Sequence, residues 1–213
     1  GDKESNMTLP FTLRFYLYYG SEQIRIQHSF VYDGNQNNDF IKSLGLQFDV
    51  PFRETVYNRH VAFSFDKDSV WTEPVQPLDG RRELDREHDY LSDQMNGLRI
   101  PEYATFDEEQ KKLLDDWAVW AGFRLSQLND GSFTIRKRAT GKSPWIGTFT
   151  GTKSCGLAFV GDVSGGISAT LKDFWQSYPS TLQIDSARAN MARMTIWLWS
   201  PEAEPMDLRH YDN

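Results

Sequence analysis

The chain has 213 residues, of which 23 are basic and 30 are acidic, giving a formal net charge of −7. At this size a single domain can bury roughly 70% of the surface that its unfolded chain exposes. An acidic chain disfavours nucleic acid and anionic membranes as partners, because both are bound through basic surfaces. The single cysteine, Cys155, excludes an internal disulfide and a cysteine metal cluster, but it does not separate a cytosolic from a periplasmic location.

The domain boundaries are predicted from composition. The chain begins with Gly1 and a polar segment, so we expect residues 1–8 to be a cloning remnant or linker. Residues 9–200 are predicted to form one β-sandwich domain taken from a larger protein, and residues 201–213 an outgoing linker. No stretch approaches the roughly 20 apolar residues of a transmembrane helix, and no apolar signal core follows the N-terminus. We expect the native protein to be periplasmic or secreted, with its signal sequence outside this chain.

Three long strands are predicted within residues 13–51. Apolar side chains occupy every second position over residues 13–19 and 24–32, and a third such run covers residues 40–50. This period of two is typical of strands with one buried face, so the pattern indicates one large antiparallel sheet. The same alternation over residues 61–71 predicts a further hairpin.

The middle of the chain is less regular. Residues 72–103 are rich in Pro, Asp, Arg and Glu and lack a sustained period, and loops of this length are usually functional or docked on a neighbour. Thr105 can cap the amides that follow, and Glu108 can reach back to the cap. This capping box predicts one short helix that ends near Asp116.

Short strands are predicted for most of the remaining chain. They cover residues 117–125, 132–138, 145–150, 156–160, 166–175, 182–185 and 191–199, with a hairpin turn at 129–131. In the last strand Met194 and Ile196 face one way and Trp197 faces the other, so this strand is expected inside a sandwich or beneath another domain. The predicted fold class is therefore all-β, a large antiparallel β-sandwich with one short helix.

Candidates for catalysis are few. His60 follows Arg59 at the start of a strand, where an imidazole beside a guanidinium could transfer a proton or hold a carboxylate. The alternative is a polar pair at the end of a strand. His28 is interpreted as a core histidine, and the four histidines lack metal-ligand spacing. Asp66 and Asp68 do not complete a calcium ligand series, so no cofactor is expected, with calcium as the weaker alternative.

Basic and aromatic residues are suited to an acidic sugar. The candidate substrate-binding residues are Arg81, Arg82, Arg136, Lys137, Arg138, Trp145 and Trp175. Guanidinium groups beside an aromatic plane can hold a uronate carboxylate and a pyranose face. The alternatives are a solvated sheet face for the charges and a packing role for the tryptophans.

Three stretches carry a family resemblance. They are YYGSEQIRIQHSFVYDGNQNNDFIKSLGLQFDVP, SQLNDGSFTIRKR with the following SPWIG, and LKDFWQSYPSTLQID with MTIWLWSPEAEP. Together they resemble the central β-sandwich of large bacterial and fungal exo-rhamnogalacturonan-lyase-like (PcRGLX-like) proteins, and the likeness covers nearly the whole chain. The resemblance implies a galactose-mutarotase-like supersandwich, preceded by a barrel-like domain and followed by an α/α toroid.

The resemblance also implies an activity for the parent protein. Such a lyase cleaves galacturonate-containing pectin by β-elimination, in which a base removes the C5 proton while cations neutralise the carboxylate. The resemblance assigns no base here, and Arg59, His60, Arg81 and Arg82 are our candidates for the cleft. We expect a structural and substrate-lining domain that is inactive or nearly so alone. Its expected partners are an acidic polysaccharide or oligosaccharide and the flanking domains, with no nucleic acid and no membrane.

Two alternatives from other functional classes stay open. A self-sufficient mutarotase-like sugar enzyme would need a histidine and a carboxylate that face each other across a concave sheet. A free carbohydrate-binding module would show an exposed aromatic strip rather than apolar strand faces that await another domain.

Overall fold

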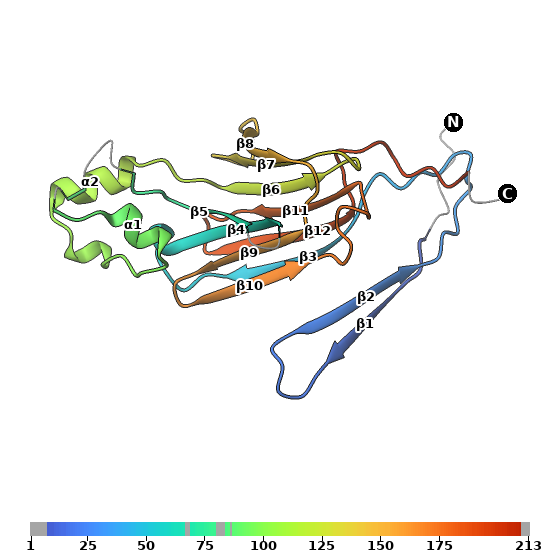
Figure 1. Cartoon of the computed structure of the whole chain (residues 1–213), viewed down its shortest axis with the longest axis horizontal. Coiled ribbons are helices and arrows are strands. Elements are labelled where there is room, and N and C mark those ends of the chain that lie inside the picture. Colours follow the sequence, from blue (N-terminus) through green and yellow to red (C-terminus); the bar gives the residue numbers. More distant parts are fainter. Residues whose placement is uncertain (1–7, 67–68, 80–83, 86, 210–213) are drawn as a thin grey trace. The chain divides into compact units, whose positions relative to one another are not determined.

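The computed structural model describes residues 8–66, 69–79, 84–85 and 87–209 (Figure 1). Its contacts divide the chain into two compact units. One unit contains the described residues before Ser43 and after Glu204, and the other spans Ser43–Glu204. The predicted remnant over residues 1–8 lies outside the described residues except for Thr8. The prediction of one domain over residues 9–200 did not separate these two units.

The first two strands form a hairpin of their own. β1 (Phe11–Leu17) pairs antiparallel with β2 (Ile24–Phe30), and within the described ranges no third strand joins them. One face of the hairpin is apolar, and Phe15 and Leu17 on it are 58% and 74% exposed. The expected large sheet over residues 13–51 is therefore wrong for these strands. A period-two pattern specifies a face of a strand but not what covers that face.

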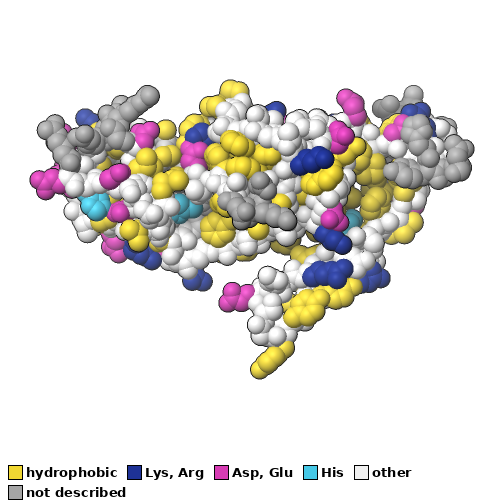
Figure 2. All heavy atoms as spheres, in the orientation of Figure 1, with side chains coloured by type: hydrophobic (Ala, Val, Ile, Leu, Met, Phe, Trp, Pro, Cys, Tyr) yellow, Lys and Arg dark blue, Asp and Glu magenta, His cyan; other side chains and the backbone are white. Residues whose placement is uncertain are grey.

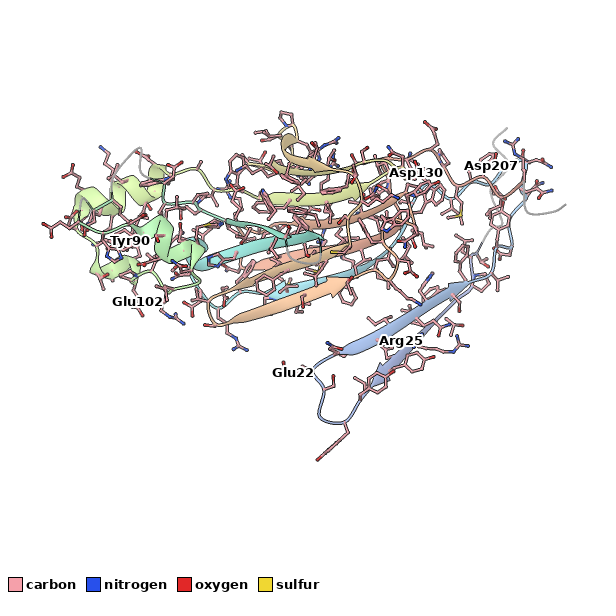
Figure 3. All side chains as sticks on the ribbon, in the orientation of Figure 1. Glu22, Arg25, Tyr90, Glu102, Asp130 and Asp207 are labelled. Atoms are coloured by element: carbon pink, nitrogen blue, oxygen red, sulfur yellow. The ribbon has the colours of Figure 1, made fainter. Side chains whose placement is uncertain are left out.

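The two faces of the hairpin differ in chemistry. His28 lies on the apolar face next to the paired residues Phe11 and Phe30, whose ring centroids are 6.1 and 6.0 Å from its own. Arg25, labelled in Figure 3, lies on the polar face, with its guanidinium carbon 5.3 Å from the ring centre of Tyr16. The hairpin is thus a two-stranded amphipathic sheet.

The second unit is a β-sandwich. Its larger sheet has the order β3 (Leu44–Pro51), β12 (Met191–Trp199), β11 (Ser180–Asp185), β6 (Gly122–Gln127), β7 (Phe133–Arg138) and β8 (Ile146–Gly151). Its smaller sheet has the order β10 (Gly165–Thr170), β9 (Leu157–Asp162), β4 (Arg59–Asp66) and β5 (Ser69–Pro74). All strand pairings within the described residues are antiparallel, which confirms the predicted fold class.

The core lies between the two sheets. Val61 and Phe63 of β4 are fully buried in one apolar cluster with Phe123 and Leu125 of β6. Since successive strand residues point to opposite faces, Arg124, which lies between Phe123 and Leu125, points to the outer face of the larger sheet. The core therefore determines which side chains of β6 and its neighbours are available to a ligand.

Short helices form one end of the sandwich unit (Figure 1). They are η1 (Val56–Asn58), α1 (Tyr90–Met95), η2 (Tyr103–Thr105) and α2 (Glu108–Asp116). The predicted helix is confirmed as α2, but its capping box joins Asp107 and Gln110 rather than Thr105 and Glu108. Acidic side chains are frequent over this end (Figure 2). Among the described residues, no helix combines the length and the apolar character needed to cross a membrane.

Candidate functional site

The outer face of the larger sheet, which we call the polar face, carries polar side chains on every strand. Residues paired across neighbouring strands share a face, so the strand registers define rows of side chains. One row contains Gln47, Thr195, Gln183, Arg124, Arg136 and Gly147, and a second contains Gly45, Trp197, Thr181, Ser126 and Thr134. The polar face thus presents guanidinium, amide, hydroxyl and indole groups side by side.

Three arginines and one indole lie together on the polar face, on β6, on β7 and just before β8. This arginine–indole cluster consists of Arg124, Arg136, Arg138 and Trp145. Trp145 lies immediately before β8, and its ring centre is 4.1 Å from the guanidinium carbon of Arg124 and 4.3 Å from that of Arg138. A cation near an indole ring is attracted by the electrons of the ring, so these arginines hold Trp145 against the sheet.

Glu202 bridges two arginines of the cluster. Its Oε1 lies 2.8 Å from Arg124 Nη2 and 3.2 Å from Arg136 Nη1, and its Oε2 accepts a hydrogen bond of 2.6 Å from the Ser126 hydroxyl. Arg124 and Arg136 are directly opposite each other on β6 and β7, where like charges repel. The carboxylate offsets that repulsion. Sequence reasoning missed Glu202, which falls in the segment expected to be a linker.

The cluster keeps an excess of positive charge. Arg138 makes a close ion pair with Asp185, so three guanidinium groups face two carboxylates. Burial lowers the pKa of Arg124, whose side chain is 11% exposed, while the nearby Glu202 raises it. The Nε atoms of Arg124 and Arg138 are buried and have no hydrogen-bond partner within the described part of the chain. This electrostatic arrangement favours an additional anionic group.

A second indole lies on the same face. Trp197 of β12 is opposite Gly45 of β3, and its Nε1 donates a hydrogen bond of 3.3 Å to Gln183 Oε1. A Cβ atom at position 45 would lie 2.8 Å from Cε3 of Trp197, so glycine is what allows this close approach. Because Gln183 is opposite Arg124, Trp197 lies beside the row that carries the cluster.

Lys137 points to the other side of the sheet from Arg136 and Arg138. Its Nζ makes a close ion pair with Glu73 of β5 and lies 4.0 Å from the ring centre of Trp120. Three consecutive strand residues cannot share one surface, because side chains alternate between faces. The structure therefore brings Arg136, Arg138 and Trp145 together and places Lys137 between the two sheets.

The other predicted sugar contacts lie elsewhere. Trp175 packs with Lys153, whose Nζ is 4.0 Å from the ring centre. No contact between Trp175 and the arginine–indole cluster is present among the residues described above. Arg81 and Arg82 lie outside the described residues. Their predicted substrate-binding role stays a prediction.

Arg59 and His60 point to opposite faces of β4. Arg59 donates hydrogen bonds to the carbonyl groups of Ala187 and Ala189, at 3.2 and 2.5 Å, and thereby ties β4 to the turn before β12. His60 Nε2 lies 2.9 Å from the carbonyl oxygen of Gln94 in α1. The structure does not bring the two candidate catalytic side chains together.

The environment of His60 predicts a pH-dependent stability. Burial lowers the pKa of His60, so the folded chain keeps the imidazole neutral where the unfolded chain, with a pKa near 6.5, takes up a proton. Because the unfolded state then binds more protons, the stability contribution of His60 is lost as pH falls from about 7 toward 5. Thermal unfolding of wild type and His60→Gln across this range should show a smaller loss in the variant. Parallel pH profiles would contradict the prediction.

A histidine and a carboxylate meet at the helical end rather than on a sheet. His88 Nε2 lies 2.5 Å from Asp93 Oδ2, and the His88 ring packs against Tyr90 of α1, labelled in Figure 3. This pair does not form the arrangement across a concave sheet that the mutarotase-like alternative requires. Over the described ranges, no three His, Cys, Asp or Glu side chains gather closely enough to hold a metal ion.

Comparison with known proteins gives two matches. The family model described as the PcRGLX-like protein central beta sandwich domain matches residues 1–213. The uncharacterized protein YetA of Bacillus subtilis (strain 168) is 34% identical over 206 residues, which is 95% of this chain and 23% of YetA. The chain thus spans about a quarter of the length of this curated relative.

Proposed function

Because the chain belongs to the family of PcRGLX-like central β-sandwich domains, we propose that it is a carbohydrate-associated domain of a rhamnogalacturonan-lyase-like protein. In this proposal the sandwich is a structural and substrate-lining part of a polysaccharide-degrading enzyme in the periplasm or outside the cell. Flanking domains of the longer chain supply the catalytic groups. The small share of YetA that the chain matches supports such a multidomain parent.

The arginine–indole cluster is the observation that carries the proposal. It concentrates positive charge on the polar face of a chain whose formal net charge is −7. Planar guanidinium groups recognise carboxylates through paired hydrogen bonds, and an indole offers a flat apolar surface for a sugar ring. An acidic sugar of a pectin-type chain combines both of these features.

Titration of the chain with rhamnogalacturonan oligosaccharides tests this proposal. Calorimetry should detect binding, while ultraviolet absorbance should detect no unsaturated product. We expect Trp145→Ala to weaken binding at least tenfold, which corresponds to about 1.4 kcal/mol, because it removes the ring surface. Trp175→Ala is the matched control and should bind as wild type does, since Trp175 makes no described contact with the cluster.

The other outcomes have definite meanings. A wild-type chain that binds no oligosaccharide would contradict the proposal, and so would equal losses in the two tryptophan variants. Formation of unsaturated product would place catalysis within this chain, and Arg59 and His60 would then be the first residues to replace. Circular dichroism of both variants must match wild type for the comparison to count.

A further inference from the structure

Glu202 contacts the arginines of the cluster as the carboxylate of a ligand would. One of its oxygens contacts the guanidinium groups of both Arg124 and Arg136, and the other accepts a hydrogen bond from the Ser126 hydroxyl. Three donors from three positions on the sheet thus converge on one carboxylate. They show which chemical group this part of the polar face accepts.

We propose that Arg124, Arg136 and Ser126 form a carboxylate-binding site that Glu202 occupies as an internal, displaceable ligand, so that a carboxylated sugar competes with Glu202. The inference rests on the proposed function only for the class of ligand. It assigns a gating role to Glu202 and limits the site to acidic sugars, because a neutral sugar cannot replace the charge.

The site requires an anion for electrostatic reasons. Arg124 and Arg136 are directly opposite on neighbouring strands, and Arg124 is largely withdrawn from water. Two cations so placed repel each other strongly unless a negative group lies between them. Exchange of one carboxylate for another keeps the number of charges constant, so it avoids the cost of an unpaired buried cation.

The surroundings allow such an exchange. Arg136 is 33% exposed, so solvent reaches the guanidinium that a ligand would contact first. Ser126 also accepts a hydrogen bond of 3.0 Å from Thr181, whose hydroxyl oxygen lies 2.9 Å from that of Ser200. This chain of hydroxyl groups stays bonded whichever carboxylate Ser126 contacts.

The position of Glu202 in the chain also favours displacement. It lies in a turn that follows β12, outside every strand of the sheet. Its backbone N–H donates to the Ser200 hydroxyl at 3.3 Å, and the Ala203 N–H donates to the Ser200 carbonyl at 3.1 Å. The side chain can therefore leave the arginines without breaking a ladder hydrogen bond.

The variant Glu202→Gln tests the proposal, since it keeps the shape of the side chain and removes its charge. D-Galacturonate is the probe, and D-galactose is the matched neutral sugar. We expect the variant to bind galacturonate at least tenfold more tightly than wild type, with no change for galactose. Adding Arg136→Gln should abolish the gain. Glu204→Gln, a change two residues further on, is the control and should leave both affinities as in wild type.

A folded Glu202→Gln variant with wild-type affinity for galacturonate would overturn the proposal. If the variant is unfolded at low salt, its thermal unfolding is measured with equal concentrations of the two sugars. Selective refolding by galacturonate supports the site, and an equal response to both sugars refutes it.

The same measurements separate this inference from the proposed function. The wild-type chain could bind the oligosaccharide through Trp145 while Glu202→Gln shows no increase in affinity for galacturonate. That result would refute only the displacement of Glu202. If Glu202→Gln binds galacturonate more tightly than wild type does, but the wild-type chain does not bind the oligosaccharide, only the proposed function is refuted.

Discussion

Replacement of Lys137 by methionine is expected to lower the free energy of unfolding by about 3 kcal/mol at neutral pH, because it leaves a buried carboxylate without its cation. Lys137 of β7 and Glu73 of β5 join the two sheets, and their side chains are only 17% and 15% exposed. Trp120 covers the lysine. The methionine side chain fills the space but cannot offset the charge of Glu73.

This loss should depend on pH. Burial raises the pKa of Glu73, and Lys137 lowers it, so removal of Lys137 raises the pKa of Glu73 further. An acidic side chain whose pKa is raised in the folded state destabilises the protein at pH values above that pKa. It costs no stability once it is protonated in both the folded and the unfolded chain. The difference between Lys137→Met and wild type should therefore be largest at pH 7 and shrink as pH approaches 4.

Urea unfolding followed by circular dichroism at pH 7 and pH 4 measures this effect. Lys172→Met is the control, because Lys172 is 92% exposed and its replacement should cost less than about 0.5 kcal/mol. The double variant Lys137→Met with Glu73→Leu should recover most of the loss. A loss below about 1 kcal/mol for Lys137→Met at pH 7 would show that water reaches Glu73 freely.

Gly156→Ala is expected to destabilise the sandwich by about 3 kcal/mol through steric overlap and backbone strain. Gly156 has a φ of +71°, and a Cβ atom there would lie 2.1 Å from Cγ of Phe174. Phe174 is buried in the main apolar cluster and has little room to move. The added methyl group must therefore displace part of the core.

Gly141→Ala provides the matched comparison. Apart from Gly141 and its two chain neighbours, no described residue would have a heavy atom within 4 Å of an added Cβ at Gly141, and Gly141 has no positive φ. Chemical denaturation should place this variant within about 0.5 kcal/mol of wild type. Equal stabilities of the two alanine variants would contradict the steric argument.

The strands could be predicted from the sequence better than their partners. Apolar alternation located nearly every strand, and Asn129 indeed accepts the backbone hydrogen bonds that close the β6–β7 turn. The pairing of β3 with β12 joins segments that are far apart in the chain, and no local pattern specifies it. For the same reason alternation alone assigns the apolar face of the β1–β2 hairpin to the main sheet, whereas the two strands form a sheet of their own.

The candidate site was predictable where it is local. Arg136, Arg138 and Trp145 lie within ten residues, and their proximity followed from spacing. The position of Arg124 opposite Arg136 depends on the register of the β6–β7 hairpin. This register could have been predicted from the turn at Asn129. Glu202 comes from beyond the last strand, so nothing near it in the sequence indicates that it meets Arg124. The inward direction of Lys137 follows from strand alternation.

The chain enters and leaves the sandwich unit at neighbouring points. It spans Ser43–Glu204, and Leu44 on β3 is paired with Trp199 on β12. A compact unit with adjacent ends can be inserted into a surface loop of another protein without stretching either partner. By this geometry the sandwich is suited to act as an insertable module, whose addition or removal leaves the fold of a host protein intact.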